Sequence, residues 1–187
     1  MKRFSLTAIV GAVLVGGVAS AAPSRAAPSR AAVERLLGGY ESQVTASDFL
    51  RLGAGVDHQL VAIAVDGKTR PLRRNRALAA LGMVPSSEGR ELLRAVVRDN
   101  LKASQGIELL DLRVAVRALG AFGPEEEADL VPLLVHSDAD VRIAAAEALA
   151  EAHAMGAVPS LRLRMSVERE GAVVRALSRA LEALAAK

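Results

Sequence analysis

The sequence predicts an all-helical protein built from stacked helix pairs, and three observations support this. Ala, Leu, Arg, Glu and Val predominate among the 187 residues, and few stretches alternate strictly between apolar and polar residues as half-buried strands do. Aromatic residues make up only 2% of the chain, so Leu, Val and Ala must fill the core, which lets helices pack closely in thin layers. The third observation is a recurring pattern.

The pattern is an Arg followed seven residues later by a Leu, with Ala between them. It is clearest over Arg142–Leu149 and recurs over Arg74–Leu81, with looser copies that end at Leu119 and Leu181. The closing leucines are 38, 30 and 32 residues apart. A step of this size fits repeated helix-turn-helix units.

The segment from Ser137 to Leu149 resembles the first helix of a HEAT-like repeat, of the short kind found in phycobilin lyases and many bacterial scaffold proteins. The family motif of Asp, then Val-Arg, an Ala-rich helix and Leu is matched by Asp138, Val141, Arg142 and Leu149, and a more degenerate copy includes Arg74 and Leu81. The resemblance covers roughly Pro71 to Leu184. It implies an α-α solenoid of about three and a half helix pairs and a protein-binding surface, but no particular activity.

Local signals predict the first helices. Ser47-Asp48 should cap a short turn through Leu52, and a helix over Val56–Val65 should end at Gly67, so that residues 47–66 form an N-terminal helical cap. The first hairpin should follow, with helices over Leu72–Leu81 and Glu88–Leu101, the second of them capped by Ser86 or Ser87.

The remaining helices are predicted in the same way. The second pair should run over Glu108–Phe122 and Glu125–Val135, and Pro132 should kink its second helix. The third pair should cover Ala139–His153 and Val158–Met165, and a last helix over Gly171–Ala185 should close the array.

The N-terminus has the features of a secretory signal peptide. Lys2 and Arg3 precede an uncharged apolar run, Phe4–Val18, which ends in Ala19-Ser20-Ala21 and is shorter than the roughly 20 residues of a membrane span. We therefore expect cleavage near Ala21 and a soluble periplasmic or secreted product without a membrane span. Residues 22–46 should form a flexible Ala/Pro/Ser/Arg-rich linker with a weak helix, most flexible over residues 22–32, and residues 47–187 the repeat domain.

The residue types argue against several functions. Signal cleavage would remove two of the 24 basic residues and no acidic one, leaving a nearly neutral chain for which nucleic acid is not an expected partner. The chain has no cysteine, and its three histidines lack metal-ligand spacing. His136-Ser137-Asp138 has the residue types of a hydrolase triad, but Ser137 suits a helix cap, and the glycines form no phosphate-binding pattern. We therefore predict no cofactor, no metal and no catalysis.

Arginine is the most prominent charged residue. Six arginines could form a positive strip that receives an acidic peptide, an anionic polymer or lipid headgroups: Arg70, Arg73, Arg76, Arg90, Arg94 and Arg98. The alternative is an ordinary solvated face, because acidic residues are interspersed among them. Arg74 and Arg142 instead fall on packed helix faces and need partners, for which Asp111, Asp138 and Asp140 are candidates.

These observations predict a non-catalytic scaffold that binds a protein or peptide. An enzyme accessory or lyase-like member of the HEAT-like family is the alternative, and a module that binds anionic polymer or acidic peptide through the arginine strip is a third possibility.

Overall fold

The computed structural model describes residues 27–39 and 44–186, and every regular element within these ranges is helical. The all-helical prediction is therefore confirmed for the described part of the chain. The predicted signal peptide and residues 22–26 and 40–43 of the predicted linker lie outside it. None of the described helices is both long enough and apolar enough to span a bilayer.

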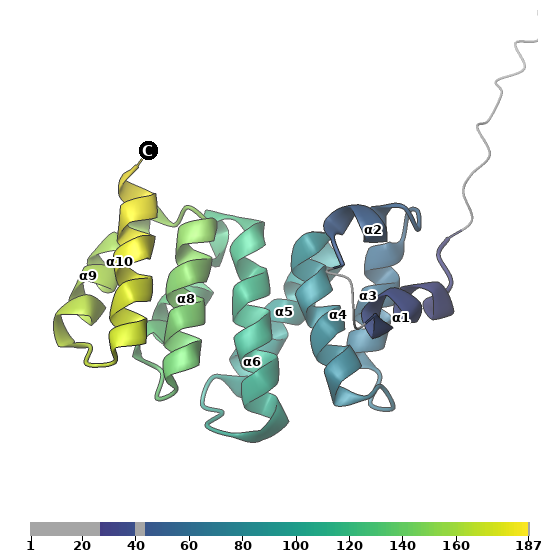
Figure 1. Ribbon diagram of the computed structural model, residues 1–187, viewed down its shortest axis with the longest axis horizontal. Helices are drawn as coiled ribbons and strands as arrows, with labels where there is room; N and C mark the ends of the chain where they lie inside the picture. Colours follow the sequence, from purple (N-terminus) through teal and green to yellow (C-terminus); the bar gives the residue numbers. More distant parts are fainter. Residues whose placement is uncertain (1–26, 40–43, 187) are drawn as a thin grey trace, which may run out of the picture.

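Most of the helices lie in two rows (Figure 1). The front row consists of four helices side by side: α4 (Pro71–Met83), α6 (Gly106–Leu119), α8 (Ala139–Glu151) and α10 (Gly171–Ala185). The back row contains α3 (Val56–Val65), α5 (Ser87–Asn100) and α9 (Val158–Val167). Within the back row, the space between α5 and α9 is occupied by η2 (Pro124–Glu126), α7 (Glu127–Leu130) and η3 (Val131–Val135), where η denotes a 3-10 helix.

The core lies between the rows and consists mainly of Leu, Val and Ala. Two glycines lie where neighbouring front-row segments are in close contact: Gly82 in α4, and Gly120 directly after α6. A Cβ atom on Gly82 would lie 2.9 Å from the Ala118 Cα atom, and one on Gly120 would lie 2.9 Å from the Ala148 Cα atom. Neither site has room for a side chain, so these glycines permit the close packing of α4, α6 and α8.

The observed boundaries agree closely with the predicted ones for most helices, and the Ser86 side chain caps α5 by accepting a hydrogen bond from the Gly89 N–H group. Both helices of the second pair differ from the prediction. The helix predicted over Glu125–Val135 with a kink at Pro132 is divided into η2, α7 and η3, and the change from α7 to η3 falls beside Pro132, which lacks an N–H group and whose ring obstructs a continuous α-helix. The helix predicted to reach Phe122 ends at Leu119 and continues as the 3-10 segment η1 (Gly120–Phe122).

The N-terminal part contains a helix where the sequence indicated mainly a linker. Helix α1 (Arg30–Gly38) is capped by the Ser29 side chain, and it buries Val33 and Leu37 while contacting α3 and α4. The tether predicted over residues 22–32 therefore gives way to helix at Arg30. Helix α2 (Ala46–Leu50) begins in a capping box formed by Thr45 and Asp48, so Thr45 replaces the predicted Ser47 as the cap.

Candidate functional site

Arginine–carboxylate pairs connect successive front-row helices. Arg74 of α4 binds the buried Asp111 of α6. Arg113 of α6 binds Asp138, the N-cap residue of α8, with 2.6 Å between Nη2 and Oδ2. Arg142 of α8 then binds the carboxylate of a residue that precedes α10. Of the three carboxylates predicted as partners for Arg74 and Arg142, only Asp111 has that role. Asp138 and Asp140 pair with Arg113 instead.

The carboxylate bound by Arg142 belongs to Glu168, whose side chain is only 2% exposed. Burial opposes ionisation of Glu168, but hydrogen bonds from Arg142, from Arg164 and from the N–H groups of residues 169 and 170 outweigh it and lower its pKa to about 2. Arg142 is 7% exposed and Arg164 is 20% exposed. The cluster of two guanidinium groups and one carboxylate therefore carries one excess positive charge, and Arg164 is its more accessible cation.

The α4 part of the predicted arginine strip faces α1. Arg73 approaches Glu34 with 3.3 Å between Nη1 and Oε2, and Arg76 donates a hydrogen bond of 2.7 Å to the Leu37 carbonyl oxygen. Arg70 precedes α4, is exposed, and forms no ion pair with any residue that the structure describes.

The α5 part of the strip faces η2 and α7. Arg90 and Arg94 converge on the buried Glu126 carboxylate, at 3.1 Å and 2.8 Å respectively. Arg98 is exposed and has no ion-pair partner among the described residues. The structure thus divides the six arginines into two groups, and Arg73, Arg90 and Arg94 are engaged by carboxylates of the chain itself.

The triad residue types do not form a catalytic relay. The Asp138 carboxylate accepts hydrogen bonds from Arg113 and the Val141 N–H group, and His136 Nδ1 accepts one from the Asp138 N–H group. Asp138, and not Ser137, caps α8. Across residues 27–39 and 44–186, no three His, Asp or Glu side chains gather in a way that could hold a metal ion.

An apolar groove between η3 and α9 holds the most exposed aliphatic side chains of the described ranges. The described residues that line it are Val131, Pro132, Leu134, Val135, Ser160, Leu163, Arg164 and Val167. Val135 is 72% exposed, Leu163 is 70% exposed and Val167 is 61% exposed, and no other large hydrophobic side chain in the described ranges is more exposed than Val135 and Leu163. The groove therefore brings together three of the most exposed aliphatic side chains in the described ranges.

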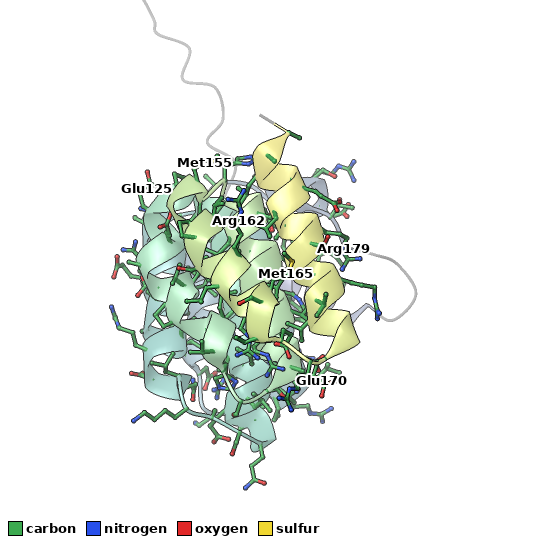
Figure 2. All side chains as sticks on the ribbon, turned by 90° about the vertical axis from the view of Figure 1, so that its left-hand side faces the viewer. Glu125, Met155, Arg162, Met165, Glu170 and Arg179 are labelled. Carbon is green, nitrogen blue, oxygen red and sulfur yellow. The ribbon has the colours of Figure 1, made fainter. Side chains whose placement is uncertain are left out.

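The local sequence explains how the groove forms. Pro132 obstructs a regular α-helix, so the segment that packs beside α9 is the short 3-10 helix η3. On α9 the groove residues fall at positions 160, 163, 164 and 167, the spacing of one helix face. Arg162 and Met165 lie outside this face, on the exposed end of the molecule formed by α9 and α10 (Figure 2).

A second groove lies between α4 and α6 on the front row. Its lining combines small residues with one charge of each sign: Ala79, Gly82, Met83, Val114, Arg117, Ala118, Ala121 and Glu151. Met83 is its only lining residue among the exposed large hydrophobics of the described ranges, at 43%. The groove between η3 and α9 is therefore the stronger candidate.

Sequence reasoning did not identify the groove. The available signal was the segment Leu161-Arg-Leu-Arg-Met165, in which apolar residues alternate with arginine although the surrounding pattern is helical. Such a helix cannot bury all of its apolar residues on one side.

Comparisons of the chain with protein-family models, with curated proteins and with solved structures found no match.

Proposed function

We propose that this chain is a non-catalytic scaffold protein that binds a protein or peptide partner in the groove between η3 and α9. The observation that carries the proposal is the gathering of Val135, Leu163 and Val167 in one groove while each remains more than half exposed. Covering these side chains would remove apolar surface from water, which is the main favourable contribution to most protein associations.

The proposal includes a fold of the α-α solenoid type, made of about three and a half HEAT-like helix pairs. The two rows of helices support it, and so does the recurrence of an arginine that reaches a carboxylate of the next front-row helix or of the segment before it. In such an array each helix pair packs mainly on its neighbours, and the surfaces along the rows remain available for partners.

We also propose that the protein is exported to the periplasm or the medium. Support comes from the sequence of residues 2–21, with two basic residues, an uncharged apolar run and a closing Ala-Ser-Ala.

The arginine contacts favour the groove over the arginine strip as the binding surface. Arg73, Arg90 and Arg94 already pair with carboxylates of this chain. These carboxylates reduce the net positive charge with which the arginine strip could attract an anionic polymer.

The test is site-specific photo-crosslinking in cells that make the protein. A photo-reactive amino acid would replace Leu163 in one chain and Met165, which lies outside the groove on the same helix, in another. We expect one crosslinked protein from position 163, saturable with expression level, and lost when Val135→Asp is added. Equal crosslinking from both positions, or none from position 163, would contradict the proposal.

A further inference from the structure

From the chemistry of the groove between η3 and α9, we infer that its occupant is an amphipathic helical segment whose aliphatic stripe is flanked by an Asp or Glu that pairs with Arg164. This inference rests on the proposed function and specifies the chemistry of the partner.

The apolar lining favours a helix as the occupant. Of the described lining residues only Ser160 and Arg164 are polar, so the groove offers few groups that could pair with the backbone of an extended peptide. Burying an unpaired N–H or C=O group costs free energy, whereas a helix satisfies these groups internally. A helix laid against η3 and α9 can bring aliphatic side chains onto Val135, Leu163 and Val167.

The need for a carboxylate follows from the contacts of Arg164. Its Nε and Nη2 atoms both donate to Oε2 of Glu168, at 2.9 Å and 2.6 Å. Nη1 forms no hydrogen bond with any residue that the structure describes. Arg164 therefore retains donors for an incoming acceptor.

The second guanidinium of the cluster has no comparable freedom. Arg142 donates to both carboxylate oxygens of Glu168 and to the carbonyl oxygens of His136 and Ser137. Glu168 in turn accepts hydrogen bonds from Arg142, from Arg164 and from two backbone N–H groups. The excess positive charge of the cluster is therefore presented by Arg164.

The charge of the groove discriminates between partners. Arg164 is the one charged side chain among the described lining residues, and none of those residues is acidic. An Asp or Glu on the incoming helix would form a charge-assisted hydrogen bond with Arg164, whereas a Lys or Arg at the same position would meet a like charge in a partly dehydrated site.

The experiment begins with a display library of helical peptides selected on the purified full chain. We expect enriched sequences to carry aliphatic residues at intervals of three and four with an Asp or Glu beside them. The best peptide and its Glu→Gln or Asp→Asn form would then be titrated against the wild type, Arg164→Gln and Arg162→Gln. Arg162 provides the matched control, because it loses the same charge on the same helix outside the groove.

Neutralising the peptide acid should weaken binding to the wild type about tenfold to a hundredfold, the usual contribution of a hydrogen bond between charged groups. The same change should have little effect on binding to Arg164→Gln and its full effect on Arg162→Gln. The peptide change needs no protein variant, so it remains decisive even if Arg164→Gln lowers stability.

Enriched peptides without an acid preference, equal behaviour of the two variants, or no enrichment at all would overturn the inference. Failure of the proposed function is distinguishable from these outcomes. If position 163 crosslinks one partner whose contacting segment needs no acid, the scaffold proposal stands and only the acidic-helix inference falls.

Discussion

Replacing Glu168 by Gln should destabilise the protein strongly at neutral pH. Its carboxyl group has a pKa of 4.5 in the unfolded reference and about 2 in the folded chain, so the fold favours the ionised form by about 3 kcal/mol. Gln cannot ionise, and it leaves Arg142, only 7% exposed, without its carboxylate. We expect Glu168→Gln to lower the free energy of unfolding at pH 7 by about 3 to 5 kcal/mol.

The destabilisation by Glu168→Gln should depend on pH in a definite direction. Because folding lowers the pKa of Glu168, its contribution is fully present above pH 4.5 and is lost as the pH falls towards 2. The difference in unfolding free energy between wild type and Glu168→Gln should therefore shrink in acid, by about 2 kcal/mol between pH 7 and pH 3.

The assay is urea unfolding followed by far-ultraviolet circular dichroism at pH 7 and pH 3, with Glu170→Gln as control. Glu170 is exposed, and its carboxylate forms no ion pair with any residue that the structure describes, so its replacement should change stability by less than about 0.5 kcal/mol. If Glu168→Gln behaves like this control at pH 7, or if its effect is equal at both pH values, the argument about the buried cluster is refuted.

Three further predictions concern the packing and the charges. Gly82→Ala should lower stability by about 1 to 3 kcal/mol in thermal unfolding, because the new Cβ atom would lie 2.9 Å from the backbone of α6, whereas Gly38→Ala, with open space around it, should be neutral or stabilising. Burial raises the pKa of Asp111, and its partner Arg74 is 37% exposed and can be solvated, so Asp111→Asn should lower the free energy of unfolding at pH 7 by less than Glu168→Gln does in urea unfolding. The Glu88 carboxylate, 2.6 Å from the ring, raises the pKa of His58. The protonated ring therefore stabilises the fold below pH 6.5, and this contribution is lost as the pH rises through the pKa that His58 has in the folded protein. An NMR titration of Glu88→Gln should show the His58 pKa moving back towards 6.5.

The helix positions were predictable because local chemistry determines them. The Ser86 side-chain oxygen accepts a hydrogen bond from the first turn of α5. A proline in the interior of a helix interrupts it, as Pro132 does here. Helix α1 was harder to predict, since it buries only Val33 and Leu37 and lies beside a segment rich in Pro and Ala. Its formation depends on contacts with α3 and α4, which no local pattern reports.

The partner of Arg142 and the groove could not be predicted, for a similar reason. Glu168 follows Arg142 by 26 residues, so their pairing depends on how the α9–α10 connection returns to α8. Leu161 and Leu163 are equivalent as residue types, yet Leu161 is fully buried and Leu163 is 70% exposed. This difference arises from the orientation of α9 in the assembled rows, not from the composition of the helix.

The central claim is that the groove between η3 and α9 serves a partner and is not needed for folding. The most direct test measures the affinity of the protein crosslinked from position 163 for Leu163→Asp and Met165→Asp, together with the unfolding free energy of both variants. Because Leu163 is 70% exposed, Leu163→Asp should unfold within about 0.5 kcal/mol of the wild type, whereas Met165 is only 36% exposed and its replacement should cost about 1 kcal/mol. We predict that Leu163→Asp binds at least about tenfold more weakly while Met165→Asp binds normally, whereas equal affinities of the two variants would contradict a role of the groove in binding.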